Sequence, residues 1–288
     1  MIPRPQSHST AIGPGVTAPS YAVAESFVRP DLSNKHTPST HLPESGSEAF
    51  AVAPEAVPGG NEKKCTQYPY VTGTSVIGLK YDGGVMLACD TLGSYGRTRR
   101  YKNVNRIKKV NSVCTIAASG ELSDLSYIVE LLEEFTNGDF CADDGIELGP
   151  KEIHSILARV MYNKRSDFDP LWNNILVAGM QDGEPFLGGV GMIGVHYIND
   201  HIATGFGNHL AIPLLREHHR PNLTEQEATA LMKSVLQVCY YRDSTAINKY
   251  QLGKVSKEGV DISEPFALQV KWDYKSYIAP ASFAPGIW

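Results

Sequence analysis

Apolar and polar residues between positions 71 and 90 follow a pattern typical of two short β-strands joined by a tight turn. The turn is predicted at Asp82-Gly83, a dipeptide that strongly favours two-residue hairpin loops. Thr74 opens the first predicted strand and Asp90 closes the second, so antiparallel pairing is expected to set them roughly opposite each other. The segment is therefore either a plain buried hairpin or a hairpin that carries an active-site hydroxyl and carboxylate.

The remaining apolar positions predict groups of strands that alternate with pairs of helices. Residues 121–135 and 153–162 show helical spacing, and a capping box at Thr224 and Glu227 predicts a helix that ends near residue 242. A short helix is predicted at residues 210–217, and strands are predicted at residues 106–110, 113–119, 172–180, 186–197, 245–255 and 266–272. This order suits an α+β fold in which two sheets pack face to face between two helix layers.

The composition divides the chain into three parts. Residues 1–60 hold nine of the 18 prolines, and their isolated apolar residues show no period. Such a segment buries too little surface to offset the entropy of ordering, so residues 1–65 are predicted to be disordered. Residues 66–272 form the predicted folded domain. The tail at 273–288 holds four aromatic residues, which is typical of a docking arm, although a frayed terminus is the default for a chain end.

Charge and cysteine usage exclude several classes of function. The net charge of −5 gives no reason to expect binding to nucleic acid or to an acidic membrane surface. Apolar runs fall short of the about 20 residues that span a bilayer, and the N-terminus lacks the pattern of a secretory signal. Five cysteines without a Cys-x-x-Cys pair predict neither disulfides nor a zinc site, and they favour a reducing compartment.

Three local patterns are weak evidence for ligands. Residues 189–194 match Gly-x-Gly-x-x-Gly, but strand-like residues follow where a dinucleotide site needs a helix, so no cofactor is expected. His218 and His219 are adjacent and do not share a helix face, so no metal site is expected. Residues 97–109 hold seven basic residues and no acid, which we interpret as a subunit contact or a solvated face rather than a nucleic-acid site.

The predicted hairpin and the Gly73-Thr74 pair before it resemble the start of the proteasome β-subunits. Residues 66–76 and 92–96 agree with that family in order and spacing, and the resemblance extends from residue 66 to about residue 272. It implies the four-layer αββα sandwich of the N-terminal-nucleophile hydrolases. In active members of the family, the Gly-Thr bond is cut and the threonine becomes the nucleophile.

The resemblance also implies roles for individual residues. Thr74 matches the nucleophile, Asp90 the first aspartate, Gly120 the oxyanion-hole residue and Asp243 the second aspartate. In the family, the threonine hydroxyl attacks the peptide and its free α-amine carries the proton, which is a form of activated-nucleophile catalysis.

Three other positions depart from the active pattern. Arg106 stands where active members have lysine, Phe206 replaces the serine of a Gly-Ser-Gly motif, and Ala246 replaces a further serine. Arginine stays protonated and does not serve as a proton shuttle, and the loss of one member of a cooperative set can remove most of the rate. We therefore predict a non-catalytic subunit. The alternatives are an active threonine-type endopeptidase with Thr74 as nucleophile, or a free-standing amidase of the same fold.

The resemblance implies a structural role in the 20S proteasome core particle, which degrades proteins in a ubiquitin- and ATP-dependent way. The implied partners are β-subunits of the same and the opposite ring, α-ring subunits and assembly chaperones, in the cytoplasm and nucleus. The resemblance also implies that residues 1–65 are a propeptide, which is expected to be cut between Cys65 and Thr66 and to leave the Gly73-Thr74 bond intact. The tail after residue 272 is implied to reach the opposite ring.

Overall fold

A computed structural model of the chain describes residues 68–142, 145 and 147–273. The predicted disordered segment at 1–65, the predicted cleavage site at Cys65 and Thr66, and all of the tail beyond residue 273 lie outside these residues.

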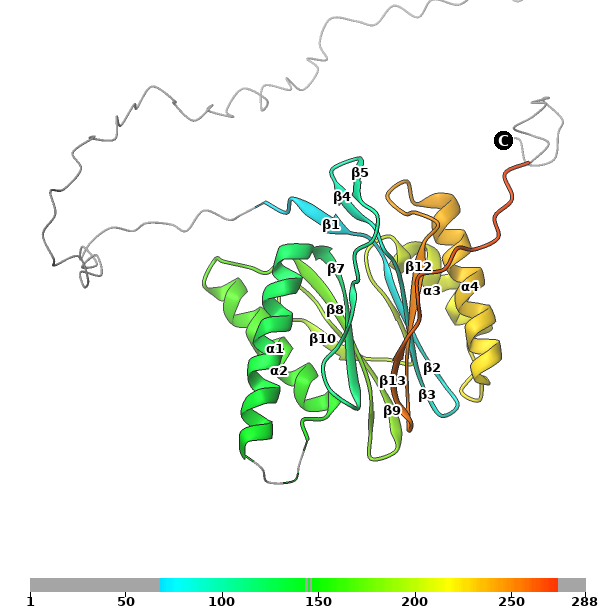
Figure 1. Cartoon of the computed structure of the whole chain (residues 1–288). Helices are drawn as coiled ribbons and strands as arrows, with labels where there is room; N and C mark the ends of the chain where they lie inside the picture. The colour runs from blue at the N-terminus through cyan, green and yellow to red at the C-terminus, as the bar shows by residue number, and fades with distance from the viewer. Residues whose placement is uncertain (1–67, 143–144, 146, 274–288) are drawn as a thin grey trace, which may run out of the picture. The chain divides into compact units, whose positions relative to one another are not determined.

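Two antiparallel sheets form the centre of the molecule (Figure 1). The strands of the eight-stranded sheet are, in spatial order, β10 (His196–Ile198), β9 (Glu184–Val190), β8 (Asn173–Gln181), β7 (Cys114–Glu121), β1 (Val71–Gly73), β4 (Gly93–Tyr95) and β5 (Thr98–Tyr101), with β6 (Ile107–Lys109) also paired to β7. Those of the five-stranded sheet are β11 (His201–Ala203), β2 (Val76–Tyr81), β3 (Gly84–Asp90), β12 (Tyr250–Ser256) and β13 (Gly259–Ile262).

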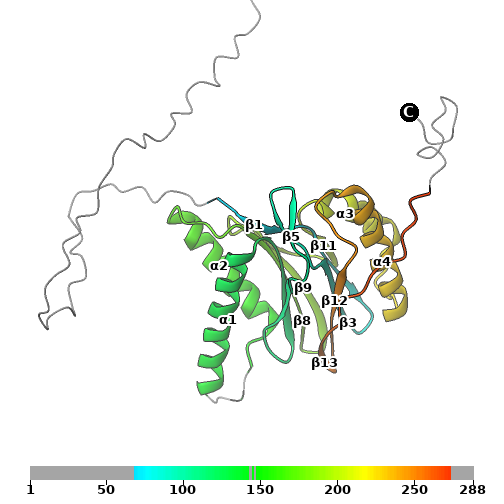
Figure 2. The same ribbon diagram turned by 45° about the horizontal axis from the view of Figure 1, so that its top comes forward.

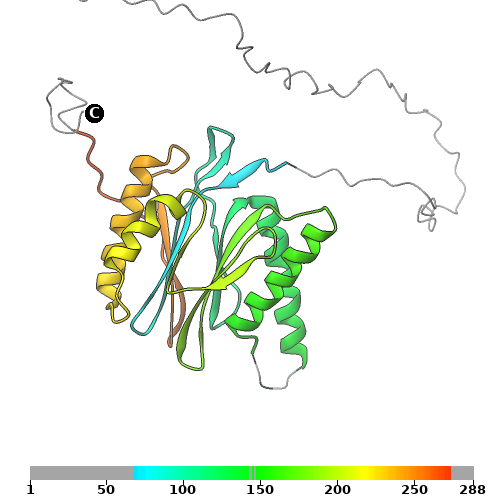
Figure 3. The same cartoon turned by 180° about the vertical axis from the view of Figure 1, so that it is seen from behind.

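Helices cover the outer face of each sheet, as Figures 1 and 3 show from opposite sides. The four helices of the described part are α1 (Leu122–Ala142), α2 (Pro150–Ser166), α3 (Gly207–His218) and α4 (Glu225–Arg242). Buried side chains of α1 and α2 pack on β7 and β8, and those of α3 and α4 pack on β2, β3 and β12. A third apolar cluster fills the space between the two sheets. The predicted α+β class is confirmed.

Local sequence signals explain the best-predicted elements. The β2–β3 hairpin turns at Asp82 and Gly83, and Gly83 has a φ of +92°, which glycine adopts at little steric cost. At the start of α4, the Glu227 amide donates to the Thr224 hydroxyl at 3.3 Å. The Thr224 amide donates to the Glu227 carboxylate at 3.0 Å, which completes the predicted capping box.

Other elements differ from the prediction. The strand predicted at residues 266–272 is wrong, because only Phe266 makes an isolated bridge to Tyr250 and the hairpin partner of β12 is β13. The strand predicted at 186–197 is split into β9 and β10, because the chain turns at Gly194, where φ is +83°. Strands β1, β4, β5, β11 and β13 were not predicted, because three or four residues are too few to show a period.

Candidate functional site

Thr74 lies where the chain leaves the eight-stranded sheet at β1 and enters the five-stranded sheet at β2. It therefore precedes the first hairpin strand rather than opening it. The β2–β3 register pairs Val76 with Cys89, so Ser75 rather than Thr74 is level with Asp90. The expectation that Thr74 and Asp90 face each other is off by one residue, and a one-residue step moves a side chain to the other face of a strand.

Arg106 is the fully buried centre of the site. Its Nη1 donates to the carbonyl oxygens of Thr74 at 2.8 Å and Ala118 at 3.1 Å, and its Nε donates to the carbonyl of Asp90 at 3.1 Å. Its Nη2 donates to the carbonyl of Ser75 at 3.3 Å and forms an ion pair with the carboxylate of Asp90. The guanidinium thus joins β3 and β7, which belong to different sheets, and its planar donors are all directed at fixed acceptors.

Asp90 is the counter-charge of Arg106 and makes no hydrogen bond to Thr74. Its second carboxylate oxygen accepts from the amide of Ile247 at 3.2 Å. Burial raises the pKa of the Asp90 carboxyl, whereas the Arg106 guanidinium and the Ile247 amide favour its charged form. The carboxylate is therefore held as part of a buried ion pair.

Asp243, at the C-terminal end of α4, is the residue that contacts the threonine hydroxyl. Thr74 Oγ1 donates to Asp243 Oδ2 at 2.5 Å. The other oxygen, Oδ1, accepts from the amide and the hydroxyl of Thr245 at 2.8 and 2.6 Å. The side chain of Ala246 is buried, and this residue offers only its backbone amide, which donates to the carbonyl of Asp243 at 3.2 Å.

The Gly-Phe-Gly position brings no hydroxyl to the site. Phe206 is the N-cap of α3, and its side chain is 59% exposed. The neighbouring Gly207 amide donates instead to the hydroxyl of Ser75 at 2.7 Å. Sequence reasoning missed Ser75, although its place directly after Thr74 was the available signal.

Gly120 lies on β7 beside the chain segment that precedes Thr74. Its φ is +98°, and a Cβ at this position would lie 2.0 Å from the carbonyl oxygen of Trp172. Gly120 is paired with Gly73 of β1. A Cβ at Gly73 would lie 2.4 Å from Cδ of Arg106, so both glycines are required by close packing.

A comparison with known families identifies the chain. A family model described as "Proteasome subunit" matches residues 70–255, which contain all the residues of the site described above. The chain belongs to the proteasome subunit family.

Individual relatives agree with this assignment. "Proteasome subunit beta type-4" of Arabidopsis thaliana is 47% identical over 227 residues, which are 79% of this chain and 92% of the relative. "Proteasome subunit beta type-7" of Saccharomyces cerevisiae is 40% identical over 221 residues, or 73% and 83% of the two chains. The predicted membership of the proteasome β-subunits is confirmed, and these relatives carry the names beta type-4 and beta type-7.

In this proteasome subunit, β1 fills the space between β7 and β4 next to Thr74. Thr72 pairs with Glu121 of β7 on one side and with Ser94 of β4 on the other. Peptide substrates of many proteins bind as an added strand. A substrate that approached Thr74 between these two strands would have to displace the chain's own β1.

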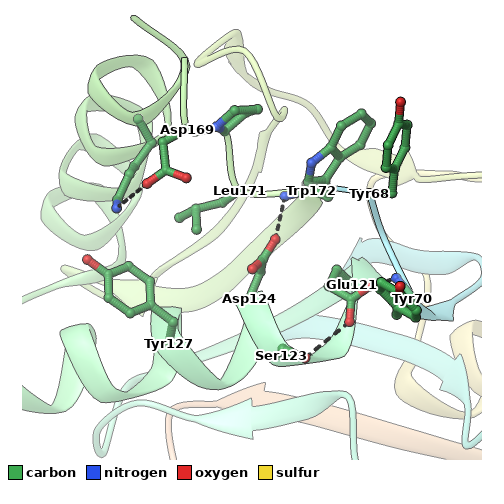
Figure 4. A pocket seen from close by; sticks show the side chains of 11 residues that line it. Tyr68, Tyr70, Glu121, Ser123, Asp124, Tyr127, Asp169, Leu171 and Trp172 are labelled. Atoms are coloured by element: carbon green, nitrogen blue, oxygen red, sulfur yellow. Dashed lines mark hydrogen bonds and ion pairs between the residues drawn. The ribbon is translucent and has the colours of Figure 1, made fainter. Parts of the chain in front are cut away.

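Glu121 fastens the start of β1, and sequence reasoning missed it. Its carboxylate accepts from the amides of Tyr70 and Val71 and from the hydroxyl of Ser123, the last at 3.1 Å (Figure 4). The side chain of Glu121 also lines a surface hollow of about 340 Å³. In this hollow the carboxylate of Asp124 accepts from the backbone amide of Trp172 at 2.8 Å. Burial raises the pKa of the Asp124 carboxyl.

The described residues hold no group of three or more His, Cys, Asp or Glu side chains arranged to bind a metal ion. No helix in the described ranges has the length and apolar character needed to cross a membrane.

Proposed function

We propose that this chain is a non-catalytic β-subunit of the 20S proteasome core particle, with an N-terminal-nucleophile hydrolase fold, and that it forms part of the β-ring wall. The observation that carries the proposal is the buried guanidinium of Arg106. An arginine whose donors are all directed at carbonyls and at Asp90 has no lone pair to take a proton and is not free to move.

The surroundings of Thr74 support the same conclusion. A nucleophilic threonine needs a group that accepts its proton and an open approach for the scissile carbonyl. The expected cleavage before Thr66 leaves the nitrogen of Thr74 joined to Gly73, as an amide and not a free amine. Asp243 is already engaged by Thr245, and β1 occupies the approach between β4 and β7.

The proposed partners follow from membership in a particle of many subunits. They are β-subunits of the same and the opposite ring, α-ring subunits and assembly chaperones. The proposed location is the cytoplasm and nucleus, where the particle degrades ubiquitin-tagged proteins with ATP-dependent regulators. The beta type-4 and beta type-7 names of the relatives support this assignment. The tail at residues 273–288 is proposed to reach the opposite ring.

A threonine-directed covalent inhibitor is expected to label other β-subunits of the purified particle and to leave Thr74 unmodified. Replacing Thr74 with alanine is expected to leave all peptidase activities of the particle near their original values, because the side chain of Thr74 only donates a hydrogen bond to Asp243. Mass spectrometry of the inhibited particle and fluorogenic peptide assays make the two measurements. An adduct on Thr74 would favour the alternative, an active threonine-type endopeptidase.

The mature chain is expected to begin near Thr66 and to keep the Gly73-Thr74 bond. Self-cleavage needs the same oriented groups that Arg106, Phe206 and Ala246 do not supply. The intact mass of the chain from assembled particles checks this expectation. A mature terminus at Thr74 would contradict it and would remove β1 from the sheet.

A further inference from the structure

The hairpin formed by β4 and β5 carries a run of cations without any acid. Residues 95–103 are all exposed and include Arg97, Arg99, Arg100 and Lys102. None of these four cations forms an ion pair with another residue in the described part of the chain. We call residues 93–103 the basic hairpin. It is a local positive patch on a chain whose net charge is −5.

The basic hairpin extends beyond the neighbouring strands, as Figures 1 and 2 show, yet it is held on the side of the five-stranded sheet. Arg99 Nη2 donates to the carbonyl of Ser244 at 3.2 Å. Lys249 Nζ donates to the side-chain oxygen of Asn103 at 2.9 Å and adds a cation beside the hairpin. The hairpin is therefore anchored at Arg99 and Asn103 and is not a free loop.

On its other side, the basic hairpin joins the eight-stranded sheet through β1. In the described residues, β4 pairs only with β1 and β5, so β1 is the strand that connects the hairpin to β7. Thr72 lies at the centre of this connection, paired with Ser94 and with Glu121. The ring of Tyr70 stacks on that of Tyr95, with 6.0 Å between their centroids. The segment ahead of the threonine is thus a structural strand that positions the hairpin.

The aromatic residues of this region favour a protein partner over single-stranded nucleic acid. Bases bind by stacking on free aromatic faces. One face of Tyr95 is covered by Tyr70, and the guanidinium of Arg100 lies 5.9 Å from the ring centroid of Tyr101. One face of each ring is occupied while the cations remain accessible, which suits an acidic protein surface better than a row of bases.

We propose that the basic hairpin is a docking element for an acidic surface of a neighbouring subunit, and that β1 holds it in the docking position. The inference rests on the proposed function, because it requires assembly with other subunits. Fixed charges guide and orient an oppositely charged partner. Cations on an edge strand also prevent unwanted strand pairing, and glutamates would do so equally well. Replacing the arginines with glutamates would therefore disrupt docking on an acidic surface but would preserve the protection of the edge strand.

The test compares two double variants of the full-length chain that change the net charge equally. Arg97→Glu/Arg100→Glu alters the basic hairpin, and Lys151→Glu/Lys257→Glu alters exposed lysines elsewhere. Each chain is co-expressed with the other subunits of the core particle, and its incorporation is measured by native gel and mass spectrometry. The hairpin variant is expected to enter the particle about tenfold less than the control, with equal melting temperatures of the two free subunits.

A second variant tests the role of β1. Thr72→Pro removes an amide from a central strand. It is expected to increase hydrogen exchange at residues 93–101 and to reduce incorporation, with exchange in β12 unchanged.

Equal incorporation of the two double variants would overturn the docking role. The docking role would also be overturned, in favour of nucleic-acid binding, if the unmodified chain bound a single-stranded oligonucleotide and the hairpin variant did not. Failure of the unmodified chain to enter the particle would instead contradict the proposed function.

Discussion

Replacing Arg106 with methionine is expected to lower the free energy of unfolding of the subunit by about 3–5 kcal/mol. The substitution leaves the buried carboxylate of Asp90 without its counter-charge, and it removes the donor from four backbone carbonyls between the two sheets. A buried charge that loses its partner keeps the whole cost of desolvation. Methionine has similar length and flexibility, so lost volume is a small part of the effect.

Urea denaturation of the purified subunit measures this loss, and Lys164→Met is the matched control. Lys164 pairs with Asp169 at 3.3 Å on the surface, and removal of such a pair costs about 0–1 kcal/mol. The double variant Arg106→Met/Asp90→Leu is expected to recover part of the stability, because both charges are absent. Equal effects of the two single substitutions would show that the buried ion pair is not the structural centre of the site.

Gly120→Ala is expected to destabilise the subunit on the order of 3 kcal/mol, without any change in the peptidase activities of an assembled particle. The φ of +98° strains any residue with a Cβ, and this Cβ would meet the carbonyl oxygen of Trp172 at 2.0 Å. That oxygen belongs to the backbone and accepts from the amide of Glu121, so it has little freedom to move.

Two glycine controls separate the causes of the Gly120→Ala effect. Gly96 has a φ of +56° and open space around it, so Gly96→Ala reports the cost of backbone conformation alone. Gly138 lies exposed in α1 with nothing near its missing Cβ, and Gly138→Ala is expected to stabilise the helix by about 0.5–1 kcal/mol. Thermal unfolding of the three variants gives the comparison. A cost at Gly120 no larger than that at Gly96 would rule out the steric contact as the cause.

The sequence alone determined the elements that depend on local signals. Gly83 allows the β2–β3 turn because its φ of +92° carries little steric cost only for glycine, and the Thr224–Glu227 capping box marks the start of α4. Helical spacing was enough to predict α1 and α2. The replacement of a lysine by Arg106 was also visible without a structure, because the chemistry of an arginine does not depend on the fold.

Only the tertiary structure decided how the site is connected. The hydroxyl of Thr74 donates a hydrogen bond to Asp243, 169 positions away in the chain, and Asp90 forms an ion pair with Arg106 and makes no hydrogen bond to Thr74. The three residues of β1 show no period, and their strand conformation depends on two neighbours and on the carboxylate of Glu121. Such contacts join segments that are distant in sequence. Their geometry depends on the packing of two whole sheets, which no local pattern of residues encodes.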